Sequence, residues 1–215
     1  MRKLQILAVS FCLLAANAAL AGPIYVVAMN TSGASGITGS LDFQFDPGPL
    51  ITQPATVEIS SFTGGAFVGL PQTIGDVTGG PLPATVTIDN TFQTNDYFQS
   101  FTFGTSLSFD VSFSGPAVDS PNGLATSTSE FVFSTFSDQN GIVPVLTPDP
   151  NGVSGTIVVN LNGSLTPSSI SPQIQITPEP GTLWMLSGAL AALSGFKVRR
   201  RFPRAQCYGA TTVTE

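Results

Sequence analysis

The sequence predicts an all-β fold, an antiparallel β-sandwich of jelly-roll or immunoglobulin-like kind. Apolar residues alternate with polar ones in stretches such as SLDFQF (40–45) and SLSFDVSF (106–113). Gly, Pro, Asn and Asp interrupt these stretches at short intervals, and no amphipathic helical pattern lies between them. Alternation with one polar face predicts sheets packed by one face only, so two sheets facing each other would bury the Phe-rich rows. A closed barrel is the alternative architecture.

The expected strands follow one another through residues 22–177. Their sequences are IYVVAM (24–29), SLDFQF (40–45), TVEISSF (56–62), ATVTID (84–89), YFQSFTFG (97–104), SLSFDVSF (106–113), EFVFSTF (130–136), TIVVNL (156–161) and QIQI (173–176). Turn sequences such as DPGP, TGGPLP, DQNG and DPNG separate them. This segment is long enough to form one domain with its own core.

Residues 1–21 have the pattern of a secretory signal peptide. A basic start is followed by an apolar stretch and by the small-residue site Ala19-Leu20-Ala21. We expect signal peptidase to cleave between Ala21 and Gly22, which would export the domain. An uncleaved membrane anchor is the alternative, but the apolar stretch is short for a span.

The composition of residues 22–177 excludes several classes of function. Of the thirteen acidic residues in the chain, only Glu179 and Glu215 lie outside this segment, and the segment contains no Lys, Arg, His or Cys. Such a segment repels nucleic acids and anionic lipid headgroups, so we expect no nucleic-acid partner. It also lacks the usual general base, thiol nucleophile and zinc ligands, so we do not expect an enzyme. A carboxylate pair is the one catalytic option left, with Glu58 and Glu130 as the candidates.

The C-terminal segment has the pattern of a single transmembrane helix. Residues 183–196 carry no charge, and residues 181–198 can span the hydrocarbon core if the basic residue near the end reaches the interface. Positive residues stay on the cytoplasmic side of a membrane, which fixes the orientation of the helix in the inner membrane. The residues that set this topology are Lys197, Arg199, Arg200 and Arg201. A buried C-terminal helix with a solvated basic tail is the alternative.

The tripeptide Pro178-Glu179-Pro180, an apolar helix and an Arg cluster stand in that order near the end of the chain. This arrangement, together with a signal peptide, resembles the PEP-CTERM sorting signal, here residues 178–204. The resemblance implies a Gram-negative bacterium that makes exopolysaccharide, and processing near the tripeptide by an exosortase, a membrane-embedded cysteine transpeptidase. It also implies that the tripeptide is a processing signal with no catalytic role. Residues 205–215 extend beyond the usual end of such a signal as a short cytoplasmic tail.

In the stretches LDFQFDPG (41–48), IGDVTGG (74–80) and NDYFQSFTFGTSLSFDVSFSGP (95–116), the exported domain is itself similar to a group of PEP-CTERM proteins whose domain has no established activity. We expect a non-catalytic structural or adhesive role at the cell surface or in the extracellular matrix, which needs only stability, solubility and export, and the resemblance of the sorting signal links this role to exopolysaccharide or biofilm. The alternative is a surface module that binds calcium or carbohydrate. Two Asx-rich turns supply hard oxygen ligands for a calcium ion, although the same sequences are common turn signals. The candidate ligands are Asp138, Asn140, Asp149 and Asn151. We expect no other cofactor.

Overall fold

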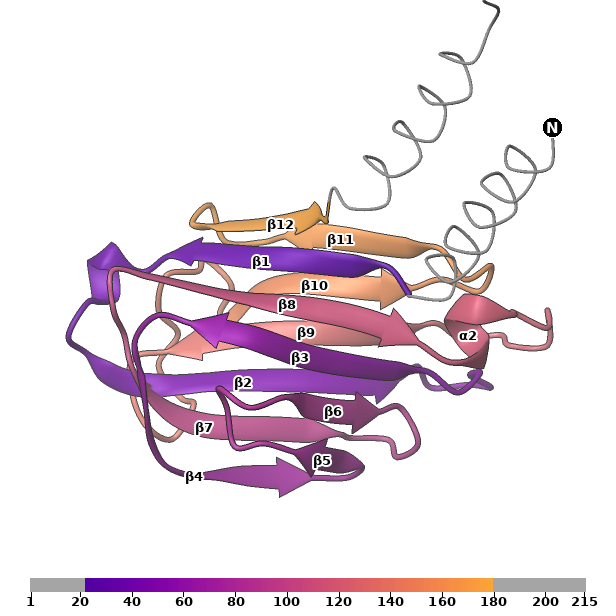
Figure 1. The fold of residues 1–215 in the computed structure, drawn as a ribbon, viewed down its shortest axis with the longest axis horizontal. Coiled ribbons are helices and arrows are strands. Elements are labelled where there is room, and N and C mark those ends of the chain that lie inside the picture. The colour runs from indigo at the N-terminus through magenta and orange to yellow at the C-terminus, as the bar shows by residue number, and fades with distance from the viewer. Residues whose placement is uncertain (1–21, 180–215) are drawn as a thin grey trace, which may run out of the picture. The chain divides into compact units, whose positions relative to one another are not determined.

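The computed structural model describes residues 22–179 of the 215-residue chain. Two six-stranded antiparallel sheets pack face to face in this part of the chain, which confirms the β-sandwich (Figure 1). The predicted signal peptide, transmembrane helix, Arg cluster and cytoplasmic tail all lie outside the described residues. The first of the two compact units of the chain ends at Glu179.

The strands of sheet 1 are, in spatial order, β12 (Ile174–Pro178), β1 (Ile24–Asn30), β8 (Ser106–Ser114), β3 (Thr56–Thr63), β6 (Val86–Asp89) and β5 (Val77–Gly79). The strands of sheet 2 are β11 (Leu165–Ser169), β10 (Val153–Val159), β9 (Ser129–Phe136), β2 (Thr38–Pro47), β7 (Asp96–Thr102) and β4 (Ala66–Ile74). Strands that are far apart in the sequence are neighbours in the sheets: β8 lies beside β1, β7 beside β2 and β6 beside β3.

Every strand predicted from alternation is present, and the three strands that were not predicted lack that pattern. β4 contains Gly69 and Pro71 and leaves Val68, Leu70 and Ile74 exposed. β5 has only three residues, and β11 is mostly polar with Pro167 inside it. Alternation indicates a strand with one buried and one open face, so it missed three of the four edge strands, which lack it.

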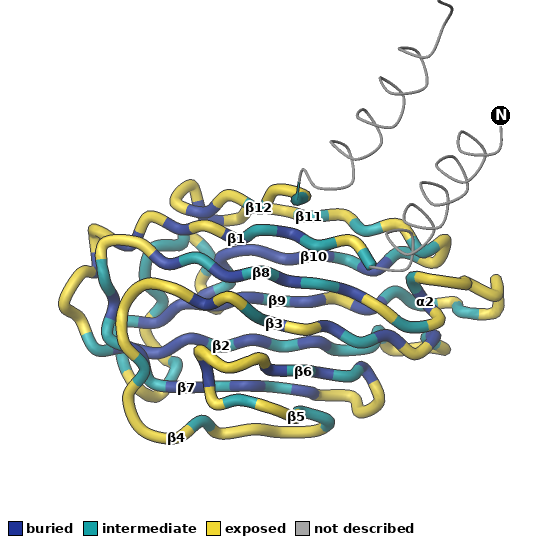
Figure 2. Tube along the Cα trace, in the orientation of Figure 1, coloured by how far each residue is buried: buried dark blue, intermediate teal, exposed yellow. Residues whose placement is uncertain are grey.

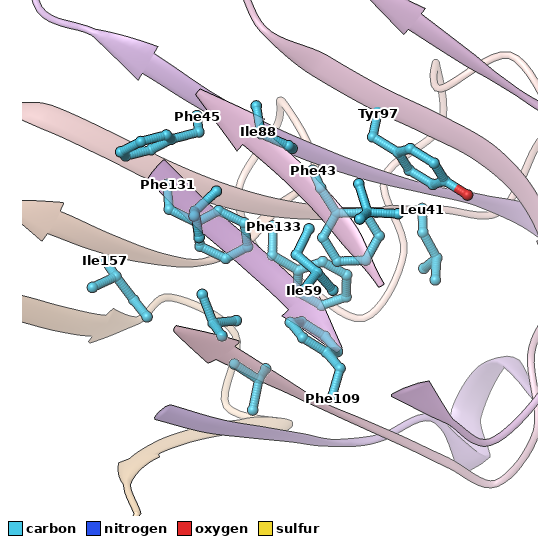
Figure 3. Close-up of a cluster of buried hydrophobic side chains, with 14 of the residues drawn as sticks. Leu41, Phe43, Phe45, Ile59, Ile88, Tyr97, Phe109, Phe131, Phe133 and Ile157 are labelled. Carbon is cyan, nitrogen blue, oxygen red and sulfur yellow. The ribbon is translucent and has the colours of Figure 1, made fainter. Parts of the chain in front are cut away.

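The core lies between the two inner faces, where the alternating Phe residues interlock (Figure 3). Phe43 of β2 and Phe109 of β8 come from opposite sheets, and their rings meet edge to face at 5.3 Å between centroids. Phe133 of β9 lies against both, at 5.2 and 5.0 Å. Contacts of this geometry add about 0.5–1.5 kcal/mol per pair to the free energy gained by burying the rings. The alternation of the sequence is visible as alternating burial along the central strands (Figure 2).

The expectation that the sandwich buries every Phe row needs a correction at two positions. Phe92 is 59% exposed in the connection between β6 and β7. Phe98 stands on β7 between the inward-facing Tyr97 and Gln99, so it points out of the sandwich. Both lie outside the strict alternation that places the other aromatic residues in the core.

All four edge strands carry features that discourage pairing with another chain. β5 is short, β11 contains Pro167 and β12 ends at Pro178. β4 contains Pro71 and a register shift against β7 between Val68 and Gln72. Proline and bulges protect an edge, because they remove or misalign the N–H groups that a new strand would use.

Helical structure within residues 22–179 is limited to a 3₁₀ turn at Ser32–Ala34 and the one-turn α2 (Pro116–Asp119). Neither is long and apolar enough to cross a membrane, and this holds for every helix of the described residues. Both pieces sit in loops at the ends of strands, so the sandwich is built from strands alone.

Candidate functional site

The carboxylates predicted as a possible catalytic pair lie in different sheets. Glu58 is on β3 of sheet 1 and Glu130 is on β9 of sheet 2. Both side chains are exposed, and each points away from the core on the outer face of its own sheet. The thickness of the sandwich separates them, so these two residues cannot act on one glycosidic bond from its two sides.

Of the four predicted calcium ligands, Asp138 and Asp149 use their carboxylate oxygens to hold turns, and Asn140 and Asn151 donate their backbone N–H groups to them. The carboxylate of Asp138 accepts hydrogen bonds from the backbone N–H groups of Asn140, Ile142 and Val143. These bonds lower its pKa, the bond from Val143 most of all. Asp149 accepts from the N–H of Asn151 in the same way. Within residues 22–179 no three His, Cys, Asp or Glu side chains form a group that could hold a metal ion. The calcium hypothesis gains no support from this geometry.

A groove with a volume of about 560 Å³ crosses the outer face of sheet 1. The register of the strands places Gln175, Ala28 and Ser108 opposite one another on β12, β1 and β8, and Thr63 of β3 lies opposite Ser108. Residues directly opposite in an antiparallel pair have Cβ atoms about 4.5–5.5 Å apart. The four side chains therefore form one continuous row across four strands.

A second row lies beside the first, one pleat further along the strands. Asn30 of β1 is opposite Ser106 of β8, and its N–H donates to the carbonyl oxygen of Gln173 at 2.9 Å. Every side chain of both rows is uncharged. Ala28 is the smallest residue of the first row and is exposed, so it leaves the space between its two polar neighbours open.

A bulge in β3 forms one wall of this groove. Ser60 pairs with Asp110 and Thr63 with Ser108, so three steps along β3 match two along β8. Within the bulge Ser61 has a φ of 55°, a left-handed conformation that costs a non-glycine residue about 1 kcal/mol or more. The bulge turns Phe62 into the core and leaves Thr63 at the edge of the groove. Bulges of this kind often redirect side chains next to functional sites.

The outer face of sheet 2 carries a different polar cluster, a pair of buried carboxyl groups. Asp42 of β2 and Asp96 of β7 are diagonal neighbours, because Gln44 is opposite Asp96 and Asp42 is opposite Phe98. The Oδ1 atoms of both are buried and receive no N–H or O–H donor from the described residues. A hydrogen bond between the two forms when one of them is protonated.

Burial keeps a proton on this pair at neutral pH. Desolvation, reinforced by the hydrogen bond with Asp96 and by its charge, raises the pKa of Asp42 to about 9. Desolvation also raises the pKa of Asp96, although the hydrogen bond from Asp42 opposes this effect. Gln44 donates its Nε2–H to Asp42 Oδ2 at 2.9 Å. The hydrogen bond between the two carboxyls places them closer together than the separated acids of a glycosidase.

The loop after β9 covers part of this second outer face. The hydroxyl of Ser40, at the start of β2, donates to the carbonyl oxygen of Asp138 at 2.8 Å. The ring of Phe98 lies so close to Gly141 that a Cβ added there would come within 2.9 Å of it. Sheet 2 is therefore closed by its own chain at the end where sheet 1 has an open groove.

The predicted sorting residues lie at the very end of the described domain. Pro178 is the last residue of β12 and pairs with Tyr25 of β1, and the N–H of Glu179 donates to Ile24 O at 2.9 Å. Gly22 is the first described residue, whereas Ala21 and Pro180 lie outside the described range. Comparisons with family models, with curated proteins and with solved structures found no match for this chain.

Sequence reasoning found neither the groove nor the carboxyl pair. Both depend on which strands become neighbours, and a single strand does not contain that information. One signal was available: Asp42, Gln44 and Asp46 are alternate polar positions of one strand, so the carboxylates of Asp42 and Asp46 had to lie on the same face.

Proposed function

We propose that this chain is an exported, non-catalytic protein of the cell envelope or extracellular matrix, sorted through a PEP-CTERM signal and linked to exopolysaccharide. On this proposal, signal peptidase removes residues 1–21 and the C-terminal helix holds the protein in the inner membrane. An exosortase then acts near Pro178-Glu179-Pro180, which releases or transfers the domain to the cell surface.

The observation that carries the proposal is where the folded domain ends. β12 closes on β1 with its last pair at Pro178, and the backbone of Glu179 makes the final hydrogen bond to Ile24. The first compact unit of the chain ends at Glu179, so its boundary falls within the tripeptide. This position supports a signal at which the folded domain is separated from the C-terminal segment.

The strand order supports a jelly roll as the finer architecture. From β1 to β5 and from β6 to β9, successive strands lie in opposite sheets, and the pairs β1 with β8, β2 with β7 and β3 with β6 are nested within one another. This nesting is typical of a jelly roll. Jelly rolls serve many functions, so the architecture alone assigns none.

The proposal is tested by the intact mass of the native protein in membranes and in culture medium, compared with a Glu179→Ala variant. This substitution removes the carboxylate of the tripeptide but keeps the N–H that bonds to Ile24, so the fold is preserved. We expect a truncated form ending near Pro178 for the wild type and an unprocessed membrane form for the variant. A Pro121→Ala change in an exposed loop is the matched control and must be processed normally. A wild-type protein that keeps its C-terminus through Glu215 in both fractions would refute the sorting proposal.

A further inference from the structure

We propose that the groove on sheet 1 is a binding site for a neutral polysaccharide chain. This inference goes beyond the proposed sorting and concerns the folded domain itself, so it stands or falls separately. It rests on the unused hydrogen-bonding groups of the groove, its lack of charge, its shape and its size.

The groove offers polar groups that the protein does not use. The side chains of Gln173, Gln175, Ser106 and Ser108 have no hydrogen-bond partner among the described residues, and all four line the groove. Each amide supplies two donors and an acceptor, and each hydroxyl supplies one donor and accepts. A sugar ring presents adjacent hydroxyl groups that also donate and accept, so it can pair with such a row. The neighbouring Asn30 is already held, because its Oδ1 accepts from the Ser32 hydroxyl at 2.7 Å.

The distribution of charge on the domain favours a neutral ligand over an anionic or a cationic one. The two rows of the groove contain no acid, and the nearest one along β8 is Asp110, which faces Val26 in the next row. No Lys, Arg or His lies within residues 22–179 to neutralise an anion. Anionic polymers are repelled by the surrounding carboxylates, and a cationic ligand finds no carboxylate within the groove to pair with.

The shape of the groove favours a chain over a protein surface. Its volume of about 560 Å³ falls within the range of about 300–1,000 Å³ that is common for small-ligand sites. The row runs across β12, β1, β8 and β3, which gives an elongated site, and the bulge at Ser60–Thr63 bounds it on one side. The centres of protein–protein interfaces are enriched in exposed aromatic and Met side chains, and these interfaces are larger than this groove. The side chain of Met29 is 2% exposed and belongs to the core, and Ala28 and Pro172 supply the apolar surface.

The test is affinity electrophoresis of the purified full chain in a zwitterionic detergent without sugar headgroups. The gels contain dextran, a mixed-linkage β-glucan or galactomannan as neutral polymers, and alginate as the anionic one. We expect at least one neutral polymer to retard the protein and alginate to have no effect. Retardation by alginate as strong as by the neutral polymers would refute the proposal, as would the absence of retardation by all three neutral polymers.

Variants on the same face locate the binding. Ala28→Phe fills the middle of the row and should weaken binding at least about tenfold, which corresponds to 1.4 kcal/mol. Gln175→Ala removes one free amide and should weaken it about five- to tenfold. Ser112→Ala, on the same face of β8 but outside the groove, should bind like the wild type. Equal retardation of the wild type, Ala28→Phe and Gln175→Ala would overturn the assignment.

Two further measurements distinguish a loss of polysaccharide binding from a loss of folding and from a failure of sorting. The thermal midpoint of each variant shows whether it is folded, and Gln175→Ala keeps the test valid if Ala28→Phe is not. The Glu179→Ala chain, which blocks processing under the sorting proposal, should bind the neutral polymer like the wild type. In the wild-type protein, binding without processing would show that the sorting proposal is wrong, and processing without binding would show that the groove proposal is wrong.

Discussion

Two tetrapeptides of nearly identical sequence, SLDF (40–43) in β2 and SLSF (106–109) in β8, occupy opposite sheets of the sandwich. Their inner residues behave alike, since all four are at most 2% exposed. Their outer residues do not. Ser40 is fully buried under the loop after β9, whereas Ser106 is exposed and lines the groove. Asp42 is part of a buried carboxyl pair, whereas Ser108 lies in an open row.

The difference shows that a strand determines its own inner face but not the environment of its outer face. The inner face is set by apolar alternation within the strand. The outer face depends on the neighbouring strands and on loops from elsewhere in the chain, here residues 137–152 and the strand β7. The outer face of sheet 2 is partly covered and contains a carboxyl pair that binds a proton, whereas the outer face of sheet 1 contains an open groove lined by uncharged side chains.

The largest effect that this comparison predicts is an equal loss of stability from the two inner Phe residues. Phe43→Ala and Phe109→Ala each remove a fully buried ring that contacts Phe133. We expect each to lower the free energy of unfolding by about 3–5 kcal/mol, because both leave a cavity in the same core. Chemical denaturation of both variants measures this. Phe92→Ala, at an exposed ring, should change it by less than about 0.5 kcal/mol, and a marked inequality between the two core variants would contradict the equivalence of the inner faces.

The next effect concerns pH and the outer face of sheet 2. The pKa of Asp42 is about 9 in the folded protein and about 3.9 in the unfolded chain. Between these values the folded state binds more protons than the unfolded state, so stability falls as the pH rises from about 4 to about 9. Asp42→Asn replaces the shared proton with an amide N–H that can donate to Asp96 at any pH. We expect it to raise the free energy of unfolding at pH 8 by about 1–3 kcal/mol and to flatten the pH profile.

The matched control for this prediction is Asp110→Asn on the outer face of sheet 1. Asp110 is opposite Val26 and Ser60 and has the carboxylate of Glu58 as a diagonal neighbour, but neither of its own oxygens is among the buried atoms without a partner in the described residues. Its substitution should leave both the stability at pH 8 and its slope with pH nearly unchanged, within about 0.5 kcal/mol. Urea unfolding at several pH values measures both variants. If Asp42→Asn and Asp110→Asn give the same profile, then the carboxyl pair does not hold a proton.

The same distinction explains how far the sequence could be interpreted. The sequence was sufficient to predict the fold class and strands such as β2 and β8, because each of these strands contains its own period-two alternation. It was not sufficient for β4, whose apolar Leu70 and Ile74 are exposed at an edge. It could not reveal that Glu58 and Glu130 lie in opposite sheets, or that Gln175 and Ser108 share a row with Ala28. These facts depend on strand order, which long-range packing decides.

The smallest effect compares the first residues of the two tetrapeptides. Ser40→Ala removes the hydroxyl that donates to Asp138 O and leaves this carbonyl without that donor under the covering loop. We expect a loss of about 1–2 kcal/mol in the free energy of unfolding, because a buried polar group loses its partner. Ser106→Ala, at the equivalent exposed position of β8, should cost less than about 0.5 kcal/mol.

Hydrogen exchange of the Asn140 and Val143 amides would localise the difference, since these two N–H groups are held by the Asp138 carboxylate. Faster exchange there in Ser40→Ala alone is the expected result, because the hydroxyl of Ser40 anchors the turn to β2. Unchanged exchange in both variants would mean that the loop is held over sheet 2 by other contacts, such as the close approach of Phe98 to Gly141.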